Sequence, residues 1–178
     1  LHPGSTAVVI GVGGLGHMAV QMLAALSPAR IVAVDAAPDK LAVAGEIGAD
    51  ATFEPGEETA TAIRELTGGR GAELVLDVVG ADATLELARS VVGFEGHLTV
   101  IGLAGGKIDY DWTALPWAAQ LTATYWGTAV ELMDVLALAS AGKIHVRVQR
   151  FGLDRVEEAY ARLRAGEVDG RAVICPNG

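Results

Sequence analysis

The sequence predicts an α/β fold with a doubly wound, six-stranded parallel sheet, followed by a C-terminal segment that lies outside that sheet. Short apolar, β-branched runs alternate with helical patterns along most of the 178 residues. Strands separated by helices of this length form parallel sheets with right-handed crossovers. A glycine-rich turn also stands between the first predicted strand and the first predicted helix, where such sheets bind their ligands.

The first half of the chain alternates regularly between strand and helix patterns. The predicted strands are Ala7–Gly11, Ile31–Asp35 and Ala51–Phe53, and the predicted helices are Leu15–Leu26, Pro38–Ile47 and Glu57–Leu66. Leu15, Met18 and Met22 recur at the i, i+3, i+7 spacing of a buried helix face. Pro38 suits a first helical turn. The pair Gly68-Gly69 is a usual helix stop.

The second half continues the pattern and then changes. The predicted strands are Leu74–Val79, His97–Ile101 and Leu121–Tyr125, and the predicted helices are Ala83–Val92 and Val130–Ala141. Six strands complete the sheet, so residues 1–143 form the predicted main domain. The remaining segment, residues 144–178, is predicted to add a strand at His145–Phe151, a helix at Asp154–Ala165 and a strand at Arg171–Ile174.

The composition is that of one globular domain in a reducing compartment. The chain is 51% hydrophobic with a net charge of −9, which argues against a nucleic-acid surface. No apolar run approaches the roughly 18–20 residues of a membrane span. Cys175 is the only cysteine, so we expect a cytoplasmic protein without disulfides. Because the chain begins at Leu1, we expect its native N-terminus to be missing.

The mean hydropathy of +0.38 is high for a domain with few aromatic residues. A parallel sheet buried on both faces produces nearly continuous apolar strands and is one explanation. Apolar surface intended for a missing domain or a second subunit is the other.

The loop from Gly11 to Gly16 reads Gly-Val-Gly-Gly-Leu-Gly and satisfies the G-x-G-x-x-G pattern. Its first glycine, Gly11, permits the tight turn, and the second, Gly13, lets the backbone approach a pyrophosphate. The third, Gly16, lets helix and strand pack closely. Free N–H groups and the helix dipole would then bind the phosphates. The pattern predicts a dinucleotide site of the Rossmann type, although glycines can also serve a turn alone.

Asp35 stands at the end of the second predicted strand, about 20 residues beyond Gly16, where an acid accepts hydrogen bonds from ribose hydroxyls. A carboxylate there repels the 2′-phosphate of NADP, and the neighbouring Ala36 and Ala37 supply no arginine for it. The position therefore predicts NAD rather than NADP, unless Asp35 is only a turn residue. Lys40 either touches the ribose or is a solvated helix lysine.

Several stretches resemble the second half of medium-chain, zinc-type alcohol dehydrogenases. They are Val9–His17, Val34-Asp35, Gly48–Asp50, Val78–Gly80, Tyr125–Thr128 and Gly170–Ile174. The likeness extends over essentially the whole chain and is closest to bacterial secondary-alcohol dehydrogenases. It implies an NAD(H)-binding domain of an enzyme that transfers hydride between a primary or secondary alcohol and NAD. It also implies a homodimer or homotetramer, and a C-terminal segment that returns to an absent catalytic domain.

The resemblance assigns coenzyme contacts by position. The backbone around Gly13, Gly14 and Leu15 would hold the pyrophosphate, and Asp35 with Lys40 the adenosine ribose. Val79, Gly102 and Leu103 match positions on the nicotinamide side, and Thr124 and Trp126 match a strand end whose backbone meets the carboxamide. Arg171 resembles an arginine that reaches the pyrophosphate, or it is an ordinary surface arginine.

No catalytic or metal-binding residue is predicted in this chain. In the resembling family a zinc ion polarises the alcohol oxygen, but its ligands lie in the N-terminal domain. Here His2, His17, His97, His145 and Cys175 show no ligand spacing. We therefore expect zinc only in the intact enzyme and an inactive isolated chain.

A Tyr-x-x-x-Lys dyad, the catalytic pair of the short-chain class, is also absent. Residues four positions after Tyr110, Tyr125 and Tyr160 are alanine or arginine. Two alternatives stay open: the coenzyme domain of a zinc-free quinone or enoyl reductase of the same superfamily, and a nucleotide-sensing Rossmann module.

The sixth predicted strand, Leu121–Tyr125, is expected to be a dimer edge. It has no lysine or proline to protect its unpaired backbone groups. The preceding stretch Asp109–Trp117 is rich in the aromatic types that favour interfaces. Alternatively, these aromatic residues cover the sheet of their own chain.

Overall fold

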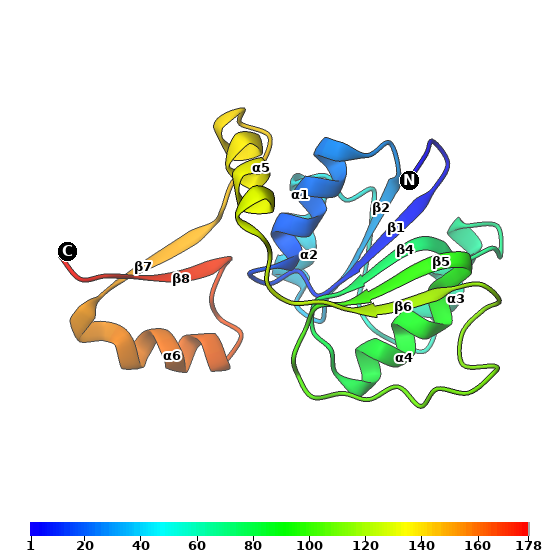
Figure 1. The fold of residues 1–178 in the computed structure, drawn as a ribbon. Helices are drawn as coiled ribbons and strands as arrows, with labels where there is room; N and C mark the ends of the chain where they lie inside the picture. The colour runs from blue at the N-terminus through cyan, green and yellow to red at the C-terminus, as the bar shows by residue number, and fades with distance from the viewer. Residues whose placement is uncertain (178) are drawn as a thin grey trace.

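The computed structural model describes residues 1–177 as a parallel sheet with helices on both faces, and a smaller C-terminal unit beside it (Figure 1). The sheet strands are β1 (Thr6–Ile10), β2 (Arg30–Val34), β3 (Ala51–Phe53), β4 (Ala72–Asp77), β5 (Val92–Val100) and β6 (Gln120–Ala123). All pair in parallel, in the order β3-β2-β1-β4-β5-β6. This is the Rossmann order, and it confirms the predicted fold class.

Two apolar cores lie on the two faces of the sheet. The covering helices are α1 (Gly16–Leu26), α2 (Pro38–Glu46), α3 (Thr59–Leu66) and α4 (Asp82–Val91). Val8 packs with Ile63 of α3 on one face, and Val9 packs with Val20 of α1 on the other. Neighbouring strand residues are therefore both buried, which accounts for the continuous apolar strands in the sequence.

Several strand boundaries differ from the prediction by two residues or more, and two of them have a clear structural cause. β4 ends at Asp77, two residues before Val79, because the Asp77 Oδ1 atom accepts hydrogen bonds from the Val79 and Gly80 amides and fixes a turn. β5 begins at Val92, directly after α4. A Cβ atom on Gly93 would lie 2.7 Å from the Arg70 carbonyl oxygen, so the strand requires a residue that a sequence pattern treats as a breaker.

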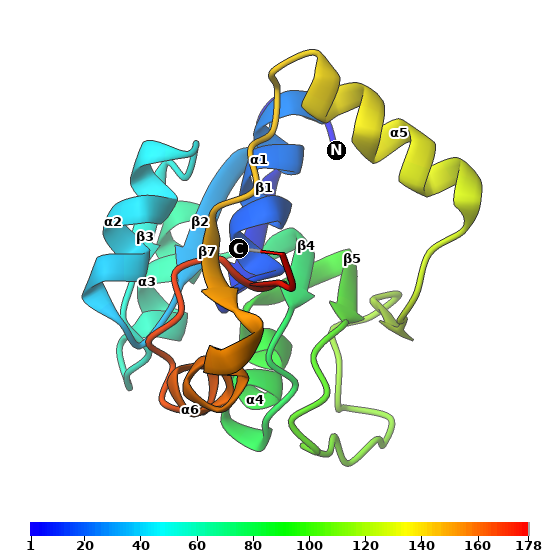
Figure 2. The ribbon, with the colours of Figure 1, turned by 90° about the vertical axis from the view of Figure 1, so that its left-hand side faces the viewer.

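Helix α5 (Ala129–Ser140) follows the sheet but buries none of its residues. Its N-terminus is capped because Thr128 Oγ1 accepts a hydrogen bond from the Glu131 amide, and Glu131 Oε2 accepts one from the Thr128 amide. Figures 1 and 2 both show α5 standing away from the sheet. Its helical conformation was predicted, but its packing within the main domain is not seen.

The C-terminal unit is a small βαβ arrangement: β7 (Val148–Gly152), a 3-10 turn at Leu153–Arg155, α6 (Val156–Arg164) and β8 (Arg171–Cys175). β7 and β8 pair in parallel with each other. Its interior contains the buried Phe151 and Ala159. The three predicted elements are thus present, and within residues 1–177 the two strands form their own sheet.

β6 ends the strand order, so the outer edge of β6 has no partner strand within residues 1–177. The aromatic side chains before it are exposed: Trp112 by 94% and Trp117 by 78%. The alternative in which these aromatics cover their own sheet does not fit that exposure. No helix in the described part of the chain is long and apolar enough to cross a membrane.

Candidate dinucleotide site

The glycine loop joins β1 to α1 at the carboxyl edge of the sheet, and its three motif glycines have different surroundings. Gly11 has a φ of +92°, which side chains rarely adopt. A Cβ atom on Gly16 would overlap the Gly11 carbonyl oxygen, whereas one on Gly13 would meet no heavy atom within 4 Å. Gly11 therefore permits the turn, Gly16 permits close packing and Gly13 faces open space, as the motif predicts.

A cavity of about 450 Å³, here called the loop cavity, opens over the glycine loop. It is lined by Gly11, Gly13, Gly14, Leu15, Gly16, Asp35, Lys40, Val78, Val79, Leu163, Gly170, Arg171 and Ala172. Most of the residues predicted from sequence to bind a coenzyme thus line one cavity. An adjoining cavity of about 600 Å³ shares Gly11, Asp35, Lys40 and Val79, and is otherwise walled mainly by apolar residues such as Val34, Pro55 and Leu87.

Asp35 follows β2 and is held by the backbone. Its Oδ2 atom accepts a hydrogen bond of 2.7 Å from the Val12 amide, and its Oδ1 atom accepts one of 2.9 Å from the Ala37 amide. The carboxylate is half-buried and lines both cavities. Each carboxylate oxygen can accept a second hydrogen bond, so the group is oriented and still able to bind a hydroxyl.

The remaining predicted residues lie on the side of β5 and β6. A third cavity is lined by Leu15, Leu103, Thr124, Trp126 and residues of α5. Leu15 belongs to both this cavity and the loop cavity. Gly102 lines neither cavity, but its backbone contacts Val79 so closely that a side chain on Gly102 would overlap the Val79 carbonyl.

Trp126 has an unusual backbone and an unusual exposure. Its φ is +67°, and its side chain is 91% exposed. A bulky residue with positive φ is strained, and such strain concentrates at functional sites. The backbone outlier Trp126 is therefore also a position that the family resemblance assigns to the carboxamide.

The C-terminal unit forms one wall of the loop cavity. A Cβ atom on Gly14 would lie 2.8 Å from Arg171 Cδ and 2.9 Å from the Gly170 carbonyl oxygen. The structure thus places Arg171 against the glycine loop.

Two side chains of α1, one turn apart, hold the start of the C-terminal unit. The buried His17 accepts a 3.4 Å hydrogen bond at Nε2 from the Arg147 amide, while its Nδ1 donates 2.9 Å to the Gly13 carbonyl oxygen. Gln21 donates to the His145 carbonyl oxygen and accepts from the His145 amide. The predicted helix Leu15–Leu26 contains both His17 and Gln21, but their docking to the C-terminal unit was not predicted. The i, i+4 spacing of two polar residues on a buried helix face is the one available signal.

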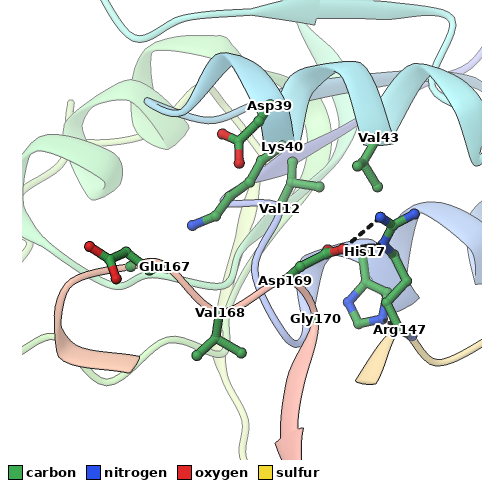
Figure 3. A pocket seen from close by; sticks show the side chains of 11 residues that line it. Val12, His17, Asp39, Lys40, Val43, Arg147, Glu167, Val168, Asp169 and Gly170 are labelled. Carbon is green, nitrogen blue, oxygen red and sulfur yellow. Dashed lines mark hydrogen bonds and ion pairs between the residues drawn. The ribbon is translucent and has the colours of Figure 1, made fainter. Parts of the chain in front are cut away.

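An ion pair closes the same region. The Arg147 guanidinium donates to both carboxylate oxygens of Asp169 at 2.6–2.9 Å, close to His17 (Figure 3). Hydrogen bonding from Arg147 lowers the pKa of Asp169, and Asp169 raises the pKa of Arg147. Both side chains remain 40–48% exposed, so this pair adds little to global stability.

Comparison with known proteins agrees with this geometry. Residues 14–141, which include the second half of the glycine loop and every helix from α1 through α5, match the family model described as zinc-binding dehydrogenase. The chain belongs to the zinc-binding dehydrogenase family. The predicted resemblance is therefore confirmed.

Individual relatives match over nearly all of the chain. An NAD-dependent alcohol dehydrogenase of Sulfurisphaera tokodaii is 32% identical over 99% of the chain and 52% of its own length. A D-arabinose 1-dehydrogenase (NADP(+)) of Saccharolobus solfataricus is 31% identical over 95% of the chain and 49% of its length. The crystal structure of the alcohol dehydrogenase from Aeropyrum pernix superposes with a TM-score of 0.92 at 35% sequence identity. The match covers 99% of this chain and 51% of the Aeropyrum chain. The chain spans about half the length of the relatives it matches.

The name of the family raises the question of a zinc site. Within residues 1–177, no three side chains of His, Cys, Asp or Glu converge in a way that could hold a metal ion. The residues present therefore do not fit a zinc centre, and we assign no zinc chemistry to this chain.

Asp77 adds a feature near the loop cavity that sequence reasoning missed. Asp77 is fully buried; its backbone carbonyl accepts hydrogen bonds from Ile101 and Gly102, while its Oδ1 holds the Val79–Gly80 turn. One residue thus joins two loops on the predicted nicotinamide side. Its Oδ2 atom has no partner within residues 1–177. The prediction placed Asp77 inside a strand, where a carboxylate is not expected to organise a turn.

Proposed function

We propose that this chain is the NAD(H)-binding part of an alcohol dehydrogenase, whose intact form transfers hydride between a primary or secondary alcohol and NAD. The observation that carries the proposal is the Asp35 carboxylate, oriented by two backbone amides beside an open glycine loop. Family membership and relatives named as alcohol dehydrogenases support it.

Each part of the coenzyme has a matching surface. The open space at Gly13 and the N-terminus of α1 suit the pyrophosphate, with Arg171 beside it. Asp35 and Lys40 suit the adenosine ribose, and the apolar cavity near Pro55 and Leu87 suits adenine. The nicotinamide would lie against Val79, Gly102 and Leu103, with Thr124 and Trp126 at the carboxamide.

When bound, NAD supplies the hydride acceptor, and this chain's residues only bind and orient it. The glycine loop fixes the phosphates, Asp35 fixes the ribose, and Asp77 fixes the two loops around the nicotinamide position. No general base is available among the residues assigned to the site. The groups that activate the alcohol, zinc included, are proposed to lie in the part of the enzyme outside this chain.

The choice of NAD over NADP is also a proposal, because the relatives include proteins named for each coenzyme. Asp35 lines the cavity at the expected ribose position, where its negative charge would repel a 2′-phosphate. The alternative of a quinone or enoyl reductase has no better support from the relatives. We further propose that residues 1–143 form the coenzyme domain, that 144–178 belong with the catalytic domain, and that the intact protein is a cytoplasmic homodimer or homotetramer.

Calorimetric titration with NADH and NADPH tests the coenzyme assignment. The wild-type chain is expected to bind NADH more tightly, and Asp35→Ser to narrow the difference by weakening NADH and strengthening NADPH. Asp39→Ser is the matched control. Asp39 is an exposed carboxylate four residues after Asp35, and it lines neither the loop cavity nor the adjoining apolar cavity. Equal affinity of the wild type for both coenzymes would contradict the assignment.

A further inference from the structure

Arg147 connects the glycine loop to the strand that carries Arg171. Its amide donates to His17 Nε2, and the other ring nitrogen of His17 bonds to the Gly13 carbonyl oxygen. Its own carbonyl oxygen accepts a 2.9 Å hydrogen bond from the Arg171 amide. Two backbone bonds therefore fix Arg147 between the loop and β8.

The ion pair adds a link between two side chains at this junction. Asp169 lies two residues before Arg171. The planar Arg147 guanidinium donates two parallel hydrogen bonds to the Asp169 carboxylate, from Nε to Oδ1 and from Nη2 to Oδ2. Gly170, between them, has a φ of +73° and approaches the Arg147 carbonyl so closely that a Cβ atom would overlap it. The turn before Arg171 is thus held to Arg147 both by the Asp169 carboxylate and by the close backbone approach at Gly170 (Figure 3).

The hydrogen bonds also define the tautomer of His17. A carbonyl oxygen can only accept, so Nδ1 must carry the proton that bonds to Gly13. The Arg147 amide can only donate, so Nε2 must offer its lone pair. The His17 ring therefore bridges the loop and the Arg147 amide through both of its nitrogens.

We propose that Arg147 and Asp169 are positioning residues for coenzyme binding: the ion pair, anchored to the glycine loop through His17, holds Arg171 beside Gly14 for the pyrophosphate. The inference rests on the proposed function and adds determinants that lie outside the loop cavity itself. Arg147 and Asp169 instead line a neighbouring cavity of about 240 Å³.

Position and charge predict opposite effects of removing the Asp169 carboxylate. Asp169→Asn deletes a negative charge close to the expected pyrophosphate and leaves Arg147 unpaired, so electrostatics alone would tighten NADH binding. If the ion pair acts by positioning Arg171, the same change weakens binding. Neutralising Arg147 would weaken NADH binding both through the lost positive charge and through the lost positioning of Arg171. Asp169→Asn is therefore the better test, because there the electrostatic effect and the positioning effect oppose each other.

The experiment is NADH titration of the 178-residue chain, followed by protein fluorescence, with thermal unfolding of every variant. Asp169→Asn is expected to weaken NADH about two- to fivefold, the range that the coupling of an exposed ion pair allows. In an Arg171→Ala background the same change is expected to alter affinity by less than about 1.5-fold, because residues that act through one another are not additive. Arg147→Lys keeps a charge opposite Asp169 without the planar fork and should show an intermediate loss.

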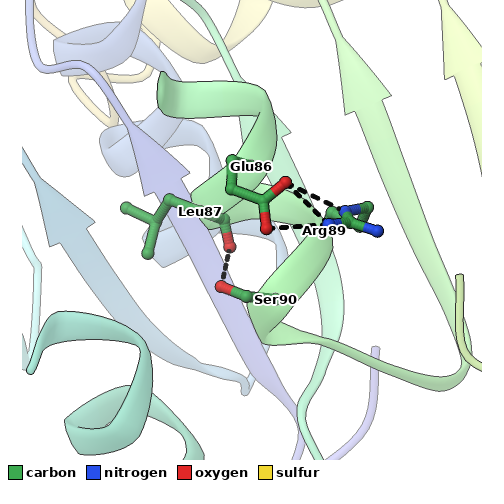
Figure 4. Close-up of polar contacts among 4 residues, drawn as sticks. All are labelled: Glu86, Leu87, Arg89 and Ser90. Carbon is green, nitrogen blue, oxygen red and sulfur yellow. Dashed lines mark hydrogen bonds and ion pairs between the residues drawn. The ribbon is translucent and has the colours of Figure 1, made fainter. Parts of the chain in front are cut away.

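Two other ion pairs provide controls. Arg155 pairs with Glu158 in the same C-terminal unit, and Arg89 pairs with Glu86 on α4 (Figure 4). Both have the same double-donor geometry and similar exposure, and none of the four residues lines the loop cavity. Glu158→Gln and Glu86→Gln should leave NADH affinity unchanged.

The outcomes separate this inference from the function on which it rests. Unchanged or tighter NADH binding by Asp169→Asn, or an equal loss with and without Arg171, would overturn the positioning role while leaving the coenzyme site intact. Failure of the wild type to bind NADH would instead overturn the proposed function. If Asp169→Asn unfolds, Arg147→Lys decides, since wild-type affinity in that variant would also overturn the role.

Discussion

Replacing Gly13 and Gly16 by alanine separates coenzyme binding from folding within one short loop. Helix and chain-entropy arguments predict that either change stabilises the protein, because alanine loses less freedom on folding than glycine. The structure predicts opposite signs. A Cβ atom on Gly13 meets nothing within 4 Å, whereas one on Gly16 overlaps the Gly11 carbonyl oxygen and lies 3.3 Å from a Val78 methyl group.

The magnitudes follow from these surroundings. Gly13→Ala should raise the free energy of unfolding by about 0.4–1 kcal/mol, or roughly 1–4 °C in Tm for a chain of this length. Gly16→Ala forces the backbone apart at a packed crossing and should cost about 3 kcal/mol or more, beyond ordinary overpacking. That is a large part of a typical stability of about 5–15 kcal/mol, so Tm should fall by roughly 6 °C or more.

Gly13→Ala, the variant expected to be stabilised, should nevertheless lose NADH affinity. The methyl group of Gly13→Ala occupies the open space where the pyrophosphate is proposed to approach, so NADH affinity should fall at least about tenfold, equivalent to about 1.4 kcal/mol. Thermal unfolding and NADH titration on the same preparations measure both quantities. The reasoning is refuted if Gly13→Ala binds NADH like the wild type, or if Gly16→Ala is as stable as the parent.

Three further predictions concern other parts of the chain. Trp126→Gly should leave Tm unchanged or raise it, because it relieves a positive φ and loses a side chain with few contacts; Trp112→Gly, equally exposed but without positive φ, should not gain. Trp117→Lys should shift a sedimenting dimer to folded monomer if the β6 edge is the subunit interface, and a monomeric wild type would exclude that interface. Because Arg147 lowers the pKa of Asp169, the stabilising effect of that carboxylate, compared by urea unfolding with Asp169→Asn, should be fully present above its ordinary pKa of about 3.9. It should disappear as the pH falls through the lower folded value.

The sheet could be predicted from the sequence because its determinants are local and repeated. Runs such as Ile31–Val34 are apolar throughout, and this pattern alone indicates a strand buried on both faces. The clearest boundary error comes from a distant contact. The start of β5 depends on Gly93 passing the backbone at Arg70, and no local pattern contains that information.

The same distinction applies to the candidate site. Gly11 to Gly16 are contiguous, and Asp35 follows at a fixed separation across one helix, so their proximity is implied by the βαβ connection itself. The contact between Gln21 and His145 joins residues 124 positions apart. Neither residue type at either end indicates a partner, so the docking of the C-terminal unit on α1 could not be predicted.

This docking changes how the two parts of the chain divide the site. Counting strands places the boundary after residue 143, because the sixth strand completes the sheet. The loop cavity is lined by residues from both sides of that boundary. Residues of the glycine loop line it together with Leu163, Gly170, Arg171 and Ala172. A segment proposed to belong with the catalytic domain thus also closes the coenzyme site. Arg171 stands so near the loop that a Cβ atom on Gly14 would lie 2.8 Å from its Cδ atom, so the position of that segment determines the space left for the proposed pyrophosphate.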